Sequence, residues 1–168
     1  MTRRAILEDP DPRLRLPSEP VDRFDASLAQ LVEDLCDTLY AGSAIGLSAP
    51  QIDDRRRVLV MDLSRQRTAP QVFVNPTILS RGAARGLVEE SCLSLPGVSA
   101  KVMRAVQLRA AARDAAGRPF ERDLADMEAV CLQHEMDHLD GVLFTDRLSL
   151  LRRLGLRLVA GRASRAAA

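Results

Sequence analysis

The sequence has few of the residues that most often build functional sites. It contains two histidines, three cysteines, one tyrosine and no tryptophan among 168 residues. Three irregularly spaced cysteines make no disulfide framework, which excludes a small disulfide-stabilised secreted domain. No run approaches the roughly 18 uninterrupted apolar residues of a membrane span. These absences predict a cytoplasmic protein. The length of the chain predicts that residues 1–168 form a single domain.

Charge of neither sign dominates the chain. The 24 basic residues nearly balance the 23 acidic ones, and the formal net charge is +1. A chain so balanced has no overall electrostatic preference for nucleic acid or for an anionic membrane. We therefore expect no membrane association and no sequence-specific binding of nucleic acid.

Hydrophobic periodicity places helices near both ends of the chain and strands between them. After Asp25, apolar residues recur at helical spacing from Leu28 to Leu39, which predicts a helix with one buried face. Runs rich in β-branched residues predict strands, and this order of elements predicts an α+β fold. The remaining expectations are an ordered proline-rich arm (8–21), a small-residue loop (41–51), strands (57–62, 71–80), a strand meeting a turn (86–97), a hairpin (105–124) and two helices (124–140, 149–159).

One segment carries a metal-binding pattern. Residues 134–138, HEMDH, fit H-E-x-x-H, and a spacing of four stacks His134 and His138 on one helix face, where both can reach one ion. Glu135 lies beside them and could exchange protons with a water on that ion. The alternative is two solvated histidines on an exposed face. Apolar residues before and after the motif favour a buried helix, whose polar groups need partners.

A catalytic metal site of this kind needs a third protein ligand. The metzincin pattern would supply a third histidine at position 144, but Phe144 stands there, and the chain has no other histidine. The ligand must then be a cysteine or a carboxylate. Cys131 precedes His138 by two helical turns, roughly 10 Å along the axis, which is too far. Cys92, where a strand meets a turn, is the best candidate.

Three segments together resemble peptide deformylases. Residues 134–138 (HEMDH) resemble the HExDH segment of that family, residues 90–94 (ESCLS) resemble EGCLS, and residues 45–51 (IGLSAPQ) resemble part of GxGLAAPQ. Their order and spacing also agree. The flanking residues 133–149 and the start at 6–15 are similar to the family as well, so the resemblance covers nearly the whole chain.

The resemblance implies an enzyme that removes the formyl group from the N-terminal formyl-methionine of newly made proteins. Cys92, His134 and His138 would hold one divalent metal ion, natively Fe(II), with Zn, Ni or Co as substitutes. Glu135 would act as general base and then general acid. The implied fold has mainly antiparallel, mixed sheets around a central metal-binding helix, with an N-terminal and a C-terminal helix.

The resemblance also implies how the peptide would be held. The side-chain amide of Gln51 and the backbone N–H of Leu93 would stabilise the oxyanion. The peptide would bind as an added strand, its methionine in an apolar pocket. The expected peptide contacts are Ile45, Gly46, Val130 and Cys131. For Val130 and Cys131, ordinary core packing is an equal alternative.

Three positions depart from the motifs of the family. Ala44 and Ser91 replace glycines, and Ser48 replaces an alanine. Glycine tolerates close backbone approach, so Ala44 and Ser91 could narrow the cleft or shift Cys92. We expect these departures to affect rate and substrate range more than the class of reaction.

Two rival interpretations remain open at this point. The first is a deformylase-like hydrolase of another formylated or acylated amine. The second is a degenerate relative that binds nascent chains or the ribosome through a basic C-terminal helix. For that helix, a solvated amphipathic helix with its leucines packed inward is the favoured interpretation. The intact Glu135 argues against a purely structural metal, which needs no proton carrier. The arginines of this stretch are Arg147, Arg152, Arg153, Arg157, Arg162 and Arg165.

Overall fold

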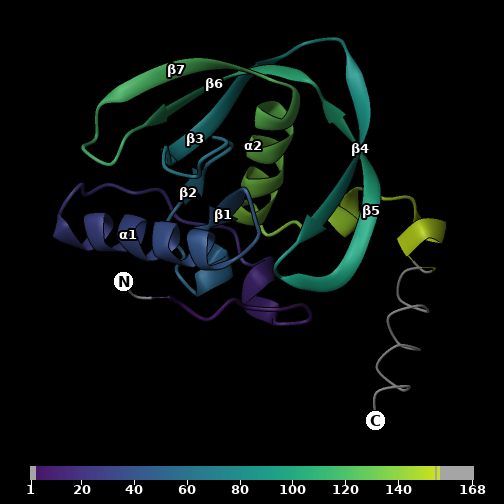
Figure 1. Ribbon diagram of the computed structural model, residues 1–168, viewed down its shortest axis with the longest axis horizontal. Coiled ribbons are helices and arrows are strands. Elements are labelled where there is room, and N and C mark those ends of the chain that lie inside the picture. The colour runs from purple at the N-terminus through teal and green to yellow at the C-terminus, as the bar shows by residue number, and fades with distance from the viewer. Residues whose placement is uncertain (1–2, 154, 156–168) are drawn as a thin grey trace.

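The fold, seen in a computed structural model that describes residues 3–153 and 155, places helix α2 between two sheets (Figure 1). One sheet has five antiparallel strands in the order β1-β2-β3-β6-β7, and the other is the antiparallel hairpin β4-β5. The α+β fold expected from the sequence is confirmed. The bounds are β1 Gly46–Ser48, β2 Val58–Met61, β3 Gln71–Arg81, β4 Arg85–Cys92, β5 Leu95–Ala105, β6 Gln107–Arg113, β7 Pro119–Ala125 and α2 Asp126–Leu139.

Strand β2 shows why the larger sheet carries a helix on each face. Successive side chains of a strand point to opposite faces. Leu59 and Met61 belong to the core that includes α2, whereas Val58 and Val60 belong to the core that includes helix α1 (Ala26–Ala41). All four side chains are fully buried. The continuous apolar sequence of β2 therefore reflects burial on both faces.

Helix α1 begins where the sequence predicts. The Asp25 side chain caps it by accepting a hydrogen bond from the Ser27 N–H at 3.0 Å. The apolar stripe from Leu28 to Leu39 packs against β1 and β2. This helix closes the outer face of the sheet, opposite α2.

Helix α2 is covered on nearly all sides, since the larger sheet and the β4-β5 hairpin flank it (Figure 1). Ten of its 14 residues are buried, and four of these are polar or charged: Gln133, Glu135, Asp137 and His138. A buried polar group costs free energy unless it finds a partner. The fold thus has to supply partners from neighbouring elements, and these partners build the site.

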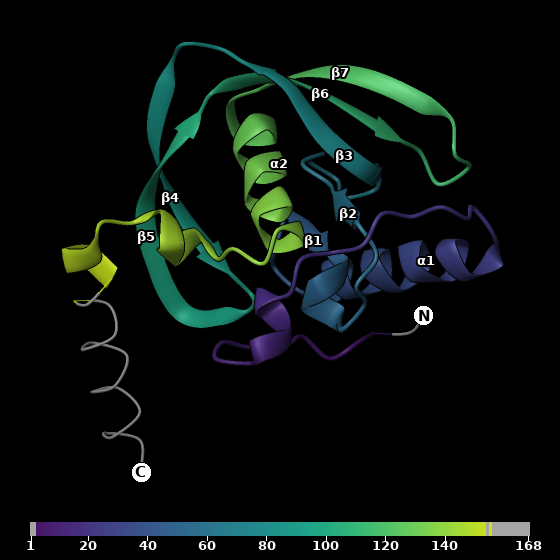
Figure 2. The ribbon, with the colours of Figure 1, turned by 180° about the vertical axis from the view of Figure 1, so that it is seen from behind.

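The proline-rich arm is ordered, as expected. It contains a 3-10 helix at Pro12–Arg15 and runs along the lower edge of the molecule from below α1 to the tip of the β4-β5 hairpin (Figure 2). The Leu7 N–H donates to the Gln51 carbonyl and the Asp9 N–H to the Ser94 carbonyl, both at 2.8 Å. The arm therefore joins two segments that lie 43 positions apart in the sequence.

Two expectations need correction. The segment 41–51 is not only a loop, because it contains β1 and the start of a 3-10 helix, Ala49–Ile52. Residues after 94 continue as strand β5, and the turn is confined to the two residues between Cys92 and Leu95. Both strands exist through pairing with distant partners, which local periodicity does not reveal.

The expected C-terminal helix lies partly outside the described residues. Residues 150–153 and 155 are helical, and residue 154 and the segment from 156 onward are not described. Within the described part of the chain, no helix combines the length and apolar character needed to cross a membrane.

Candidate active site

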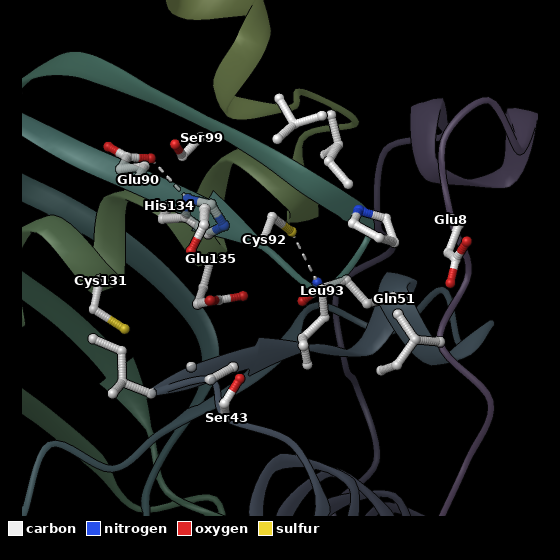
Figure 3. Close-up of a pocket in the computed structure, with 18 of the residues that line it drawn as sticks. Glu8, Ser43, Gln51, Glu90, Cys92, Leu93, Ser99, Cys131, His134 and Glu135 are labelled. Atoms are coloured by element: carbon white, nitrogen blue, oxygen red, sulfur yellow. Dashed lines mark hydrogen bonds and ion pairs between the residues drawn. The ribbon is translucent and has the colours of Figure 1, made fainter. Parts of the chain in front are cut away.

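A pocket of about 870 Å³ opens between β1, the β4-β5 turn and α2 (Figure 3). Nine of the ten residues named from the sequence line it, and His138 lies buried beneath, 1% exposed. Its volume falls within the usual range for small-molecule sites. The nine lining residues are Ile45, Gly46, Gln51, Cys92, Leu93, Val130, Cys131, His134 and Glu135.

Three side chains converge as metal ligands would. The donor atoms of Cys92, His134 and His138 all lie within 4.8 Å of one another, and Cys92 Sγ is 3.2 Å from His138 Nε2. Burial lowers the pKa of His138, which favours the neutral imidazole that binds a metal. This burial excludes the alternative of two solvated histidines. One thiol and two imidazoles suit a divalent transition metal.

Cys92 reaches α2 because of the turn that follows it. The β4-β5 register shifts between Ser91 and Cys92, and only two residues separate Cys92 from its partner Leu95. The Ser94 N–H points back to Cys92 Sγ at 3.4 Å. A tight turn with an inward backbone amide therefore presents the sulfur toward the histidines.

A buried ion cluster orients His134. Its Nδ1 lies 2.8 Å from Glu90 Oε2, which leaves Nε2 on the side of the other donors. Arg104 binds both carboxylate oxygens of Glu90, at 2.7 and 3.0 Å, and donates to Asp137 at 2.7 Å. A carboxylate behind a histidine fixes its tautomer and ring orientation when it binds metal.

Sequence reasoning did not find this cluster. Glu90 opens the ESCLS segment two positions before Cys92, so the alternation of a strand was a usable signal. Asp137 lies within the HEMDH segment, so its position between Glu135 and His138 was also a usable signal. Arg104 lies on β5, a strand that was not predicted, and nothing local marks it.

Glu135 points into the pocket without a hydrogen-bond partner for its Oε2 among the described residues. Burial raises the pKa of Glu135 to about 7, against the lowering effects of the His134 charge and the Ser48 hydroxyl. A carboxyl group with this pKa can accept and return a proton near neutral pH.

Gln51 lies with its amide nitrogen toward the sulfur of Cys92 (Figure 3). Its Oε1 accepts from both the N–H and the hydroxyl of Ser48, each at 2.9 Å. Its Nε2 contacts Cys92 Sγ at 3.4 Å and Ser94 Oγ at 3.2 Å. The amide hydrogens of Gln51 therefore point toward the sulfur of Cys92, on the side of the pocket where the three candidate metal ligands converge.

The pocket also has an apolar wall. Val130 and Cys131 line it from α2, and Ile45 stands at its rim, 36% exposed. Burial raises the pKa of the Cys131 thiol well above its usual value, so the thiol stays protonated and apolar. Cys131 also belongs to the main core, so the pocket and packing roles weighed from the sequence coexist.

Two histidines and a glutamate on one buried helix, faced by a cysteine from a neighbouring turn, define a metal-dependent hydrolase. The family model of polypeptide deformylases matches residues 3–154, and the chain belongs to that family.

Known relatives agree with this assignment along almost the whole chain. Peptide deformylase from Chromobacterium violaceum is 44% identical over 147 residues, which cover 88% of this chain and 87% of that protein. The Stutzerimonas stutzeri peptide deformylase is 46% identical and covers 88% of each. A crystal structure of a peptide deformylase from Legionella pneumophila superposes with a TM-score of 0.91 at 41% identity, over 98% of this chain and 97% of that one.

The contact between Gly46 and Glu135 generates a first prediction. A Cβ at Gly46 would lie 2.6 Å from Glu135 Oε1 and 2.7 Å from Cys131 Sγ, so Gly46→Ala must displace the glutamate side chain. We expect kcat on a formylated peptide to fall about 100-fold in a variant that still folds, because small misplacements of a catalytic group have such effects. Gly155→Ala, whose Cβ would meet nothing within 4 Å, is the control. Equal kcat values for the two variants would contradict the contact.

The ion cluster generates a second prediction. Glu90→Gln removes one of the two anionic partners of the buried Arg104 and leaves only Asp137, and removing one partner of a buried ion pair costs about 3 kcal/mol or more. Glu89→Gln, next to it on the exposed face of β4, should change the free energy of unfolding by less than about 0.5 kcal/mol. Urea unfolding of both variants measures the difference. Similar losses for both would show that the cluster does not stabilise the fold.

Proposed function

We propose that this chain is a peptide deformylase that hydrolyses the formyl group from N-terminal formyl-methionine of nascent proteins. The observation that carries the proposal is the convergence of Cys92, His134 and His138 beside Glu135 in an open pocket. Family membership supports the reaction class. Residues 1–168 would form one catalytic domain that acts in the cytoplasm, where protein synthesis supplies the substrate.

Cys92, His134 and His138 would hold one divalent metal ion. Thiolate with two imidazoles suits Fe(II), the metal we propose natively, and also Zn, Ni or Co. A cation there would supply an activated water and a Lewis acid for the formyl oxygen. Glu90 behind His134 would keep the ring in its binding orientation.

Glu135 would carry the proton through the reaction. Its unpaired oxygen accepts a proton from the attacking water, and its pKa near 7 allows the same proton to pass to the leaving amine. Gln51 Nε2 and the Leu93 N–H would donate to the formyl oxygen as negative charge develops there. These donors come from two different elements, the 3-10 helix Ala49–Ile52 and the β4-β5 turn.

The peptide would bind along an open strand edge. β1 is the edge strand of its sheet, and its outer edge at Gly46 would pair with an extended peptide beside Ile45, whose carbonyl already accepts from the Asp62 N–H. The turn after Cys92 bounds the other side. The methionine side chain would then enter the apolar wall formed by Val130 and Cys131.

Ribosome contact through the basic C-terminal stretch remains a prediction. Of its arginines, Arg147 is committed to an ion pair with Asp137, and Arg153 to one with Asp146. The arginines beyond residue 155 lie outside the described residues.

The central test is an activity assay with metal analysis. We expect protein prepared anaerobically to bind about one divalent ion per chain and to deformylate formyl-Met-Ala-Ser. Glu135→Gln should lower kcat about 100-fold or more at unchanged metal content, since it removes the proton carrier. Glu128→Gln, on the same helix but paired with Arg122, is the matched control. Equal turnover by wild type and Glu135→Gln would refute the enzymatic assignment, and faster hydrolysis of other formyl amides would redirect the substrate class.

The ligand assignment has its own test. Cys92→Ala should lose the metal, because it removes one of three ligands. Cys131→Ala should retain the metal, because the Cys131 side chain of the wild type packs in the core and is not one of the three ligands. Metal content after gel filtration, measured by mass spectrometry, separates the two variants. Equal loss from both would overturn the assignment.

A further inference from the structure

We propose that Ser48 is a positioning residue, which uses its hydroxyl and its N–H to hold the Gln51 carboxamide with the NH₂ end toward the formyl oxygen. The proposal rests on the proposed function and extends it to a residue that departs from the GxGLAAPQ segment of the family, where alanine stands at this position. The relevant contacts are the two hydrogen bonds from Ser48 to Gln51 Oε1.

Both donors of Ser48 act on the same acceptor. The N–H and the hydroxyl each lie 2.9 Å from Gln51 Oε1. A side-chain amide has one accepting end and one donating end, so a rotation by 180° would bring its NH₂ group against the Ser48 N–H, which can only donate, and would turn the hydroxyl from donor to acceptor. Ser48 is 0% exposed and Gln51 2% exposed, so water is not available to repair that mismatch. Ser48 therefore selects one orientation.

The opposite end of the amide makes two weak contacts. Gln51 Nε2 lies 3.4 Å from Cys92 Sγ, and sulfur is a weak hydrogen-bond acceptor. It lies 3.2 Å from Ser94 Oγ, at the long end of the N–H···O range. Its hydrogens are thus aimed at the site and can shift to a better acceptor, such as an oxygen that gains negative charge. Donors that are oriented before the reaction stabilise such an oxygen without reorganisation.

The hydroxyl adds to what the backbone already provides. An alanine would keep the N–H bond to Oε1 and lose only the second donor. A single net hydrogen bond corresponds to about a three- to tenfold change in an equilibrium or rate. That range sets the expected size of the effect.

The Ser48 hydroxyl has a second neighbour, which the test must separate. Its single hydrogen can also be donated to Glu135, where a hydrogen bond from Ser48 lowers the pKa of the carboxyl. A loss of activity in Ser48→Ala alone could therefore arise through either residue. Only a cycle of variants can tell whether Ser48 acts through Gln51.

The experiment compares metal-loaded wild type, Ser48→Ala, Gln51→Ala and the double variant on formyl-Met-Ala-Ser. We expect Ser48→Ala to lower kcat about three- to tenfold at unchanged KM, because the interaction matters only in the transition state. Gln51→Ala should lower kcat about 100-fold or more. Adding Ser48→Ala to Gln51→Ala should then change nothing further.

Three results would overturn the proposal: a full kcat in Ser48→Ala, a loss confined to KM, or the same loss in the Gln51→Ala background. The last would assign the effect to Glu135 instead. A wild type without turnover would refute the proposed function itself, and this outcome is distinct from a failure of Ser48 in an active enzyme.

Two further variants separate donation from packing. Ser48→Cys keeps the approximate size and replaces the hydroxyl by a weak donor, so it should resemble Ser48→Ala in kcat. Ser18→Ala removes a buried hydroxyl that has no partner among the described residues and should leave kcat unchanged. A fully active Ser48→Cys would show that volume, not donation, is what Ser48 contributes, and would also overturn the proposal.

Discussion

The structure depends on how a few buried charges are neutralised. Arg104 on β5 binds Glu90 on β4 and Asp137 on α2, and all three side chains are almost fully buried. Breaking such a group leaves an unpaired charge in the interior, so the β4-β5 hairpin and the helix are held in one relative position. The hairpin carries Cys92 and the helix carries both histidines. The same ion cluster that satisfies the interior thus sets the distance between the metal donors.

The close packing of β1 against α2 is the second feature that shapes the site. β1 lies so near α2 that only a glycine fits at position 46, and this proximity brings the edge strand of the sheet next to Glu135. The 3-10 helix after β1 then carries Gln51 toward Cys92. Glu135, the Gln51 amide and the Cys92 sulfur come from three separate elements, which are α2, the 3-10 helix after β1 and the end of β4.

Much of this arrangement could be predicted from local spacing. The four-residue interval between His134 and His138 indicated a helix face, and the shortage of other histidines directed attention to Cys92. The elements that were missed depend on long-range pairing. β1 has three residues and exists because it pairs with β2, and Arg104 is informative only once β5 lies beside β4 and α2. Ser48 was noted as a departure from the family, but its contact with Gln51 needs the coordinates of both.

The N-terminal arm adds a different kind of constraint. It ties the segment after β1 and the turn after Cys92 through backbone groups of Leu7 and Asp9, so main-chain hydrogen bonds join the two walls of the pocket in addition to the Gln51 side chain. Backbone hydrogen bonds of this kind do not depend on the side chain at each position, except that proline has no N–H to donate. The sequence of the arm can accordingly drift during evolution while the width of the pocket stays constant, provided that the length of the arm does not change.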